Sequence, residues 1–265
     1  MAFVEATSLT LAFAGVRALD GVSLSVPKGA LFAVIGPNGA GKTSLFNCIS
    51  GVYKPSAGRV VLDGIDLATK RPHEIAALGV ARMFQNTALF ENMTVLDNLL
   101  IGRHYLYKPS FWSNLFWLPS TKREEVAHRK RAEEVIDFLN LERYRKIPVQ
   151  ILPYGVRKRV ELGRALCMEP RLLLLDEPTA GLNQEETEEM ARYLLDIKAE
   201  LGVTQILIEH ELRFVLDLAD RVAVLDFCRK IAEGTPEEVR VDPLVVEAYI
   251  GTATTPSPAT PQETA

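Results

Sequence analysis

The segment GPNGAGKT at residues 36–43 has the residue types that bind phosphate groups. It follows the apolar run LFAVI and precedes a segment of helical periodicity, which is the setting that the pattern G-x-x-x-x-G-K-[ST] requires. Glycines let backbone N–H groups approach phosphate oxygens, and the helix adds the positive end of its dipole. We predict that Lys42 reaches the β- and γ-phosphates and that Thr43 is a ligand of Mg²⁺. The predicted loop comprises Gly36, Pro37, Asn38, Gly39, Ala40, Gly41, Lys42, Thr43 and Ser44.

A second group of chemically active residues ends the run LLLLDEP at 172–178. Four leucines predict a buried strand, and open parallel sheets bind their ligands at the carboxyl ends of strands. Asp176 would hold Mg²⁺ through its water shell, whereas Glu177 would point elsewhere and polarise an attacking water as general base. Alone, this pattern also fits a strand end with solvated acids. Downstream of a phosphate loop, it is strong evidence for a nucleotide site.

Two further side chains follow predicted strands. His210 closes TQILIEH, where it would sense the γ-phosphate or hold the attacking water, although Glu209 competes for this role. Gln85, in VARMFQNTALF, would contact Mg²⁺ or water, although many glutamines end strands without such a role. The remaining histidines lack this setting and are interpreted as surface or packing residues: His73, His104 and His128.

The composition restricts the class of protein. The chain has 265 residues, 48% hydrophobic and 24% charged, which fits one large domain or one domain with a sizeable insertion. Its net charge of −4 argues against a broad nucleic-acid footprint, so we expect no nucleic-acid partner. The cysteines show neither pairing nor ligand spacing and are interpreted as small buried apolar residues of a reducing compartment: Cys48, Cys167 and Cys228.

Neither a secretory leader nor a membrane-spanning segment is expected. Glu5 and the alternating SLTLAFAG replace a basic-then-apolar leader. The aromatic run PSFWSNLFWLPS at 109–120 is bracketed by prolines and too short to cross roughly 30 Å of hydrocarbon. A role at a membrane would therefore require that other proteins hold the chain there.

The elements that must position these residues alternate along the chain. The first third is rich in strands, with Asp63-Gly64 as a tight turn, and residues of about 88–165 are mostly helical with charged faces. From residue 170, nearly unbroken apolar strands alternate with amphipathic helices, which indicates an α/β fold with a parallel sheet covered on both faces. The tail GTATTPSPATPQETA at 251–265 is expected to be disordered.

The order phosphate loop, glutamine, signature region, Asp-Glu and histidine resembles the ATP-binding subunits of ABC transporters over essentially residues 1–250. The resemblance implies a P-loop NTPase core with a mostly parallel sheet, an N-terminal antiparallel β subdomain and an inserted helical subdomain at about 88–165. It also implies two ATPase chains, identical or related, that sandwich two ATP molecules head to tail. Phe13 would then stack on adenine, with a core aromatic as the alternative, and Asn183 in TAGLN would lie where the chains meet.

The signature region departs from the usual Leu-Ser-Gly-Gly, because the chain has LPYGV at 152–156. The resemblance implies contacts with the partner's ATP from Leu152, Pro153, Tyr154 and Gly155. Pro153 has neither hydroxyl nor N–H, whereas Gly155 allows close approach and a helix from near Val156 directs its positive end at the phosphate. The run 157–159, RKR, either adds positive charge or is a solvated first turn. Each lost hydrogen bond to a charged group is worth about 1.5–3 kcal/mol, so closure would be weakened but not abolished.

Several stretches resemble the ATPases of branched-chain amino-acid uptake systems: LPYG with RKRVELGRAL, GVARMFQN, EPTAGLN, and the C-terminal AEGTPEEV and EAYIG. Two features depart from that type, namely Val156 at a usually polar position and LDFCRK without the usual hairpin glycine.

The resemblance implies two membrane permeases that dock in a groove lined from Gln85 to about Asn98. A periplasmic solute receptor would act indirectly, and the chain would lie peripherally on the cytoplasmic side of the inner (plasma) membrane. The run FWSNLFWLPS would contact a permease or the bilayer, or form a satellite core. The alternatives are the ATPase of a lipopolysaccharide-type lipid exporter, a soluble ABC ATPase and a nucleotide-binding subunit that hardly hydrolyses.

Overall fold

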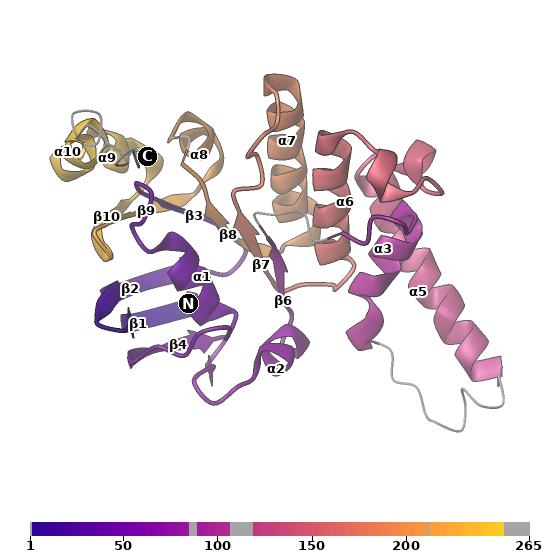
Figure 1. Cartoon of the computed structure of the whole chain (residues 1–265), viewed down its shortest axis with the longest axis horizontal. Coiled ribbons are helices and arrows are strands. Elements are labelled where there is room, and N and C mark those ends of the chain that lie inside the picture. The colour runs from indigo at the N-terminus through magenta and orange to yellow at the C-terminus, as the bar shows by residue number, and fades with distance from the viewer. Residues whose placement is uncertain (1, 85–88, 107–118, 211, 252–265) are drawn as a thin grey trace, which may run out of the picture.

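The computed structural model describes residues 2–84, 89–106, 119–210 and 212–251 (Figure 1). A four-stranded antiparallel sheet with the order β2-β1-β4-β5 forms one part of the molecule. Its strands are β1 (Ala2–Phe13), β2 (Val16–Pro27), β4 (Ala57–Leu62) and β5 (Ile65–Asp66). Asp63 and Gly64 join β4 to β5 with φ of 48° and 81°, which confirms the predicted tight turn.

A six-stranded sheet with the order β10-β9-β3-β8-β7-β6 crosses the molecule, and five of its strands are parallel. Its strands are β3 (Leu31–Ile35), β6 (Val80–Met83), β7 (Leu172–Asp176), β8 (Thr204–Ile208), β9 (Arg221–Asp226) and β10 (Arg229–Gly234). β10 joins through an antiparallel hairpin. The predicted α/β class, with a mostly parallel sheet and an N-terminal antiparallel sheet, is confirmed.

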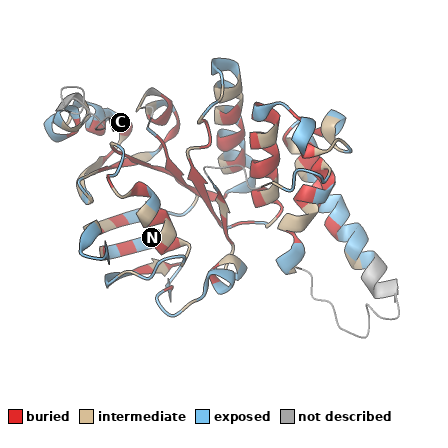
Figure 2. Ribbon diagram, in the orientation of Figure 1, coloured by how far each residue is buried: buried red, intermediate tan, exposed pale blue. Residues whose placement is uncertain are grey.

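Alternate residues of β3 enter two different cores. Leu31, Ala33 and Ile35 belong to a core formed with α6 (Tyr154–Leu166), α7 (Gln184–Leu201) and α8 (Leu212–Leu218). Phe32 and Val34 belong to a core shared with the antiparallel sheet and α1 (Lys42–Ile49). Figure 2 shows the resulting band of buried residues through the middle of the fold. The central strands are apolar along their whole length because both faces are covered.

The chain between β6 and β7 contributes a group of helices at the end of the molecule opposite the antiparallel sheet (Figure 1). They are α3 (Val95–Gly102), η1 (His104–Leu106), α5 (Pro119–Phe138), η2 (Glu142–Tyr144), η3 (Val149–Ile151) and α6. Thr94 caps α3, because its hydroxyl accepts a hydrogen bond from the N–H of Asp97. On α5, Arg129 and Lys130 pair with glutamates four residues later at 4.0 and 3.9 Å, as expected for a solvated helix.

The remaining helices are α2 (Pro72–Ala77), α9 (Pro236–Val241) and α10 (Pro243–Gly251). The predicted disordered tail beyond Gly251 and the aromatic run at 111–118 lie outside the described residues. The helices that are described include none whose length and hydropathy together match a bilayer-spanning segment.

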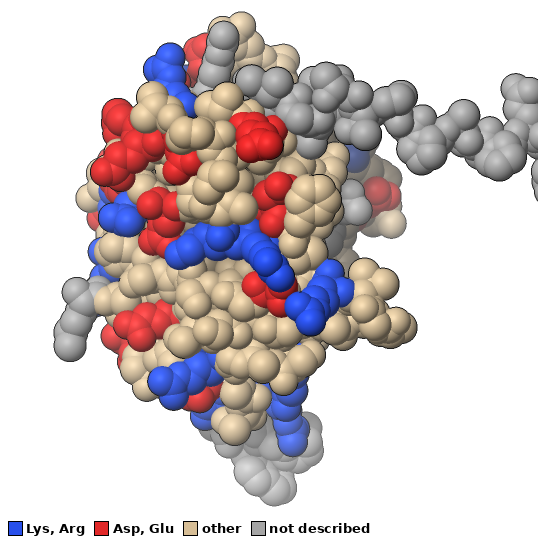
Figure 3. Space-filling model, turned by 90° about the vertical axis from the view of Figure 1, so that its left-hand side faces the viewer, with Lys and Arg blue, Asp and Glu red and all other residues tan. Residues whose placement is uncertain are grey.

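The hairpin between β9 and β10 turns through Phe227 and Cys228, whose φ values are 40° and 66°. Both residues therefore adopt the left-handed conformation that glycine adopts at lower cost. The turn is joined to β2, because Asp20 donates its N–H to the carbonyl of Cys228 and its carboxylate binds Arg229 at 2.6 Å. On this side of the molecule, basic and acidic side chains border one another (Figure 3).

Candidate functional site

Glycine suits the three glycine positions of the predicted phosphate loop for different structural reasons. Gly36, Gly39 and Gly41 all have positive φ, at 148°, 82° and 97°. A Cβ on Gly36 would lie 2.0 Å from the carbonyl oxygen of Leu225, and one on Gly41 would lie 2.5 Å from that of Ala18. A Cβ on Gly39 would meet no atom within 4 Å. Two of the glycines thus allow the loop to pack on β9 and β2, whereas Gly39 borders open space.

Lys42, the first residue of α1, lies inside the curl of this loop. Its Nζ donates to the carbonyls of Gly36 and Pro37 at 2.7 and 3.1 Å, and the side chain is buried. Burial lowers the pKa of Lys42, while the carboxylates of Glu177, Asp176 and Glu209 act in the opposite direction. The ammonium charge is therefore held at the loop by backbone oxygens and nearby carboxylates.

A cleft of about 400 Å³ opens beside the loop. It brings together residues that the sequence assigned to separate motifs, because Glu177 and the loop line the same space. The lining residues are Val16, Arg17, Ala18, Asn38, Gly39, Ala40, Gly41, Lys42, Thr43, Ser44, Glu177 and Cys228. The contributions of β2 and of the β9–β10 turn could not be predicted from the sequence, since neither carries a motif.

Phe13 is not among the residues that line this cleft. It ends β1 with 45% of its surface exposed, and its ring meets the edge of Tyr53 with centroids 5.0 Å apart. Its proposed stacking on adenine stays a prediction.

Asp176 and Glu177 diverge, as predicted, at the carboxyl end of β7. Glu177 has φ of 49° and donates its N–H to Ile208 at 3.0 Å, so the chain turns sharply after the strand. Asp176 is buried, and its Oδ2 lies 2.7 Å from Nη2 of Arg82 on β6. The carboxylate of Glu177 faces the cleft, whereas that of Asp176 bonds to a neighbouring strand.

His210 and Glu209 differ in burial, although Nδ1 of His210 also lies 3.8 Å from Oε2 of Glu209. Nδ1 of His210 lies 3.9 Å from Oε1 of Glu177, and the histidine side chain is 58% exposed. Glu209 is fully buried and accepts hydrogen bonds from the N–H and hydroxyl of Thr179 at 3.1 and 2.5 Å. Burial raises the pKa of Glu209, and these hydrogen bonds oppose that rise. Of the two candidates for holding the attacking water, His210 is the one beside Glu177. Gln85 lies outside the described residues.

The signature helix α6 begins at Tyr154 with Pro153 as its N-cap, two residues earlier than expected. The Tyr154 hydroxyl donates to the carbonyl of Ala180 at 3.2 Å, and its ring lies 3.1 Å from the position of a Cβ on Gly181. A Cβ on Gly155 would lie 2.2 Å from Oε1 of Glu186. The altered signature thus packs against the TAGLN loop of its own chain.

The suggestion that residues 157–159 form a solvated basic turn is wrong for two of them. Lys158 is fully buried, and Arg159 is buried and bonds Glu189 at 3.0 Å. Arg157 donates to the carbonyls of Leu152, at 3.0 Å, and Gln150. Lys158 and Arg159 are therefore enclosed, whereas Arg157 is half-exposed.

Two other features of this region were noted from sequence. Val156 is also buried, which accounts for an apolar residue at this position. Asn183 caps α7, because its side chain accepts a hydrogen bond from the N–H of Glu186 at 2.9 Å.

The cysteines and histidines outside the cleft are mainly packing residues. Cys48 and Cys167 are buried, as expected, and burial raises their thiol pKa values to about 11 and about 12. The same expectation is wrong for Cys228, which is half-exposed at the cleft because the hairpin turn carries it there. His128 is buried and accepts a hydrogen bond from Nε of Arg103 at 2.9 Å. His73 and His104 are exposed.

The C-terminal helix α10 also reaches the phosphate loop. Tyr249 is half-buried, and burial raises its pKa to about 12, while the backbone of Gly36 lies next to its hydroxyl. No motif in the sequence signalled this contact.

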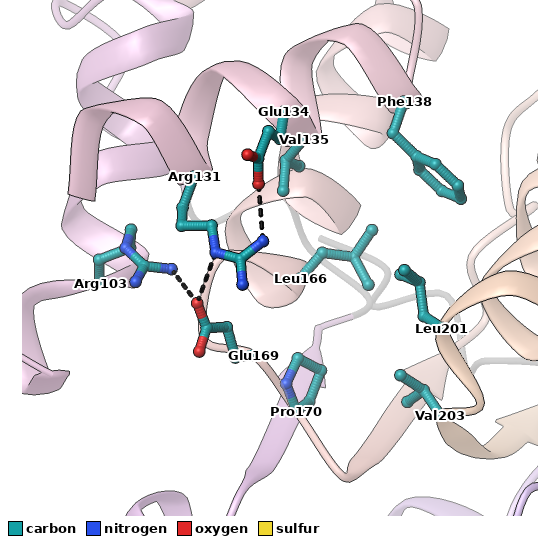
Figure 4. A pocket seen from close by; sticks show the side chains of 10 residues that line it. All are labelled: Arg103, Arg131, Glu134, Val135, Phe138, Leu166, Glu169, Pro170, Leu201 and Val203. Atoms are coloured by element: carbon teal, nitrogen blue, oxygen red, sulfur yellow. Dashed lines mark hydrogen bonds and ion pairs between the residues drawn. The ribbon is translucent and has the colours of Figure 1, made fainter. Parts of the chain in front are cut away.

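A second cavity, of about 360 Å³, lies at the opposite edge of the sheet, where Pro170 and Val203 precede β7 and β8 (Figure 4). Arg131 pairs with Glu134 at 2.7 Å, and Glu169 pairs with Arg103 at 3.1 Å. Because these charged groups pair with one another over an apolar wall, we assign no chemistry to this cavity.

Comparisons with known proteins agree with this geometry. Residues 19–180 match the family model described as ABC transporter, and residues 229–254 match the one described as Branched-chain amino acid ATP-binding cassette transporter. The chain is 38% identical over 250 residues to the high-affinity branched-chain amino acid transport ATP-binding protein BraF of Pseudomonas aeruginosa, covering 94% of this chain and 98% of that protein. It is 36% identical to the corresponding LivG protein of Escherichia coli K12, with the same coverage.

Solved structures show the same relationship. A nucleotide-free ATP-binding cassette from an ABC transporter superimposes with a TM-score of 0.82 at 36% identity, covering 95% of this chain and 100% of that one. A cassette in its ADP conformation gives a TM-score of 0.83 at 37% identity, covering 95% and 99%. The chain therefore belongs to the ABC transporter family, as one of its ATP-binding cassettes.

Proposed function

We propose that this chain is the ATP-hydrolysing subunit of an ABC transporter that takes up branched-chain or related hydrophobic amino acids. The observation that carries the hydrolytic role is the shared cleft, where Lys42 inside the phosphate loop and the carboxylate of Glu177 line one space. The substrate class is supported by the names of the relatives and by the match of residues 229–254.

The residues present fit a magnesium ion that accompanies the nucleotide. Mg²⁺ prefers oxygen ligands and is bound in such sites by one or two side chains together with substrate phosphates. Thr43 lines the cleft with a hydroxyl, and Asp176 brings a buried carboxylate to the same edge of the sheet. These two residues would hold the ion, which would neutralise charge on the β- and γ-phosphates.

The chain's own groups then have separate tasks. Lys42 binds the phosphates together with the loop N–H groups. Glu177 orients the attacking water and accepts its proton at a carboxylate oxygen. His210, 3.9 Å from Glu177, holds the water or contacts the γ-phosphate, and Gln85 is proposed to contact Mg²⁺ or this water. The exposed side chain of His210 is available for this role.

Two cassettes are proposed to close head to tail, so that each site is completed by the partner's signature loop and TAGLN loop. The signature contribution would come from Leu152, Pro153, Tyr154 and Gly155 at the start of α6. In the same chain this loop already contacts Ala180, so closure at one site would be communicated to the loop that ends at Asn183.

The cassettes would be held at the cytoplasmic side of the inner membrane by two permeases, and a periplasmic receptor would deliver the substrate. Phe90 and Met93 lie in the segment proposed to line the permease groove, and both are exposed. Exposed apolar side chains of this kind suit a protein interface.

The test of the hydrolytic role is Glu177→Gln, which keeps the size of the side chain but removes the base. We expect turnover to fall by about 10²–10⁴, because general base catalysis contributes that much, while nucleotide binding persists and a nucleotide-bound dimer accumulates. Glu200→Gln, an exposed change at the end of α7, is the matched control. Turnover near that of the wild type in Glu177→Gln would remove Glu177 from this role.

The substrate class needs a separate experiment with the reconstituted transporter. We expect a receptor loaded with leucine, isoleucine or valine to stimulate ATP hydrolysis in proteoliposomes. Stimulation by lipid, with no response to the loaded receptor, would instead support the lipid-exporter alternative.

A further inference from the structure

Arg82 on β6 makes a set of buried contacts that no motif in the sequence signalled. Its Nη2 lies 2.7 Å from Oδ2 of Asp176, and the two side chains are 9% and 4% exposed. Its Nη1 donates to Oδ1 of Asn47 at 2.6 Å. The guanidinium also lies over the rings of Phe46 and Phe84, with centroids 5.7 and 4.9 Å away. One planar group is therefore fixed by a carboxylate, an amide and two aromatic faces.

These contacts join the two elements that carry the proposed magnesium ligands. Asp176 ends β7, whereas Asn47 lies on α1, the helix that begins with Lys42 and Thr43. β6 is the neighbour of β7 in the sheet, and Arg82 pairs with Leu174 in the register. The guanidinium thus fixes the carboxylate of Asp176 relative to the helix that carries Thr43.

We propose that Arg82 is a positioning residue for the magnesium site, an inference that rests on the proposed ATPase function. Because Arg82 binds Oδ2 of Asp176, Oδ1 is the oxygen that Asp176 would offer to the ion or to its water shell. Such partners of ligating carboxylates fix the orientation of the ligand, and their loss costs about 10–100-fold in metal affinity. A lysine cannot replace this function fully, because one ammonium does not reproduce the planar fork of arginine.

The charge of Arg82 has a second effect on the same carboxylate. A buried carboxylate without a partner is strongly unfavourable, and Arg82 compensates Asp176 when no ion is bound. A free Mg²⁺ ion would approach a carboxylate that is already paired with a cation. The phosphates of the nucleotide add the negative charge that favours the ion, so Mg²⁺ should bind together with the nucleotide.

The test compares Arg82→Met, Arg82→Lys and the wild type. ADP carrying a fluorescent N-methylanthraniloyl group is bound to each protein, and Mg²⁺ is then titrated; a parallel titration measures nucleotide affinity in EDTA. For Arg82→Met we expect the half-saturating Mg²⁺ concentration to rise about tenfold, with unchanged affinity in EDTA. Arg82→Lys should lie between Arg82→Met and the wild type.

Arg171→Met is the control, because Arg171 also pairs with a carboxylate, that of Asp63, and lies over an aromatic ring, that of Phe3. It lies at the other end of β7 and should leave both titrations unchanged. If Arg82→Met does not fold, the shift in Arg82→Lys decides the question.

Three outcomes would overturn the inference. The first is a half-saturating Mg²⁺ concentration in the Arg82 variants that is unchanged or lower than in the wild type. The second is an equal loss of nucleotide affinity with Mg²⁺ and in EDTA, which would indicate that Arg82 supports α1 in general. The third is a wild-type chain that binds no labelled ADP, which would overturn the proposed function as well. The wild-type titration therefore separates the failure of the inference from that of the function.

Discussion

Gly36→Ala and Gly39→Ala are expected to separate the stability of the phosphate loop from its function. Both changes add one methyl group to a residue with positive φ, but the new Cβ atoms meet different surroundings. At Gly36 it would lie 2.0 Å from the carbonyl oxygen of Leu225 in β9, whereas at Gly39 it would meet nothing within 4 Å. Gly39 also lines the cleft in which the phosphates are proposed to bind.

The expected magnitudes follow from these distances. For Gly36→Ala, backbone strain costs about 1–3 kcal/mol and overpacking against β9 about the same again. Stiffening of the unfolded chain offsets about 0.4–1 kcal/mol, so the net loss of stability is about 2–5 kcal/mol. For Gly39→Ala the only cost is the left-handed conformation of the alanine, which is about 1–2 kcal/mol. The same stiffening of the unfolded chain offsets part of this cost, so the net loss of stability is about 1 kcal/mol.

Nucleotide affinity should instead fall more in Gly39→Ala than in Gly36→Ala. The methyl group of Gly39→Ala would displace a phosphate oxygen from a backbone N–H, and a hydrogen bond to a charged group is worth about 1.5–3 kcal/mol. We therefore expect the affinity of Gly39→Ala for nucleotide to fall by about tenfold or more.

Urea unfolding followed by circular dichroism gives the stability, and titration with a fluorescent ADP gives the affinity. Gly202→Ala is a suitable control, since Gly202 caps α7 with φ of 63°, a Cβ there meets nothing within 4 Å, and the residue is not among those that line the cleft. If Gly36→Ala and Gly39→Ala lose equal stability, the packing argument fails. If Gly39→Ala binds nucleotide as the wild type does, the loop does not enclose the phosphates as proposed.

The other predictions concern side chains around the same cleft. An alkylating reagent at neutral pH should label Cys228 but not the buried Cys48 and Cys167, whose thiol pKa values are raised to about 11 and about 12. Because Cys228 lines the cleft, bound nucleotide should slow its labelling, which mass spectrometry would measure. Labelling of Cys228 at an equal rate with and without nucleotide would contradict nucleotide binding in this cleft. Phe227→Asn should stabilise the fold by about 0.5–1 kcal/mol in urea unfolding, because asparagine tolerates the left-handed conformation better and Phe227 is almost wholly exposed. The pKa of Glu209 is raised in the folded state, so its contribution to stability falls as pH rises above its ordinary value of about 4.3. As pH rises from acid to neutral, Glu209→Gln should therefore gain stability relative to the wild type, as measured by urea unfolding. A difference in stability between the two proteins that does not change with pH would refute this.

The sequence by itself determined the chemistry of the loop and the type of sheet. GPNGAGKT has a local meaning, because glycines and the start of a helix create a phosphate site within eight consecutive residues. The runs LFAVI, LLLLD and TQILI are apolar without alternation, and only strands covered on both faces require this. Such features depend on neighbours in the sequence and can be read without a structure.

Tertiary structure alone decided which side chains meet. The pairing of Arg82 with Asp176 joins residues that are 94 positions apart, and the burial of Lys158 depends on how α6 packs against the rest of the fold. Glu209 and His210 are adjacent in sequence, yet one bonds Thr179 in the interior and the other lies beside Glu177. The local sequence around a charged side chain does not predict whether it will be solvated or buried, because burial depends on contacts between distant segments that only the folded chain brings together.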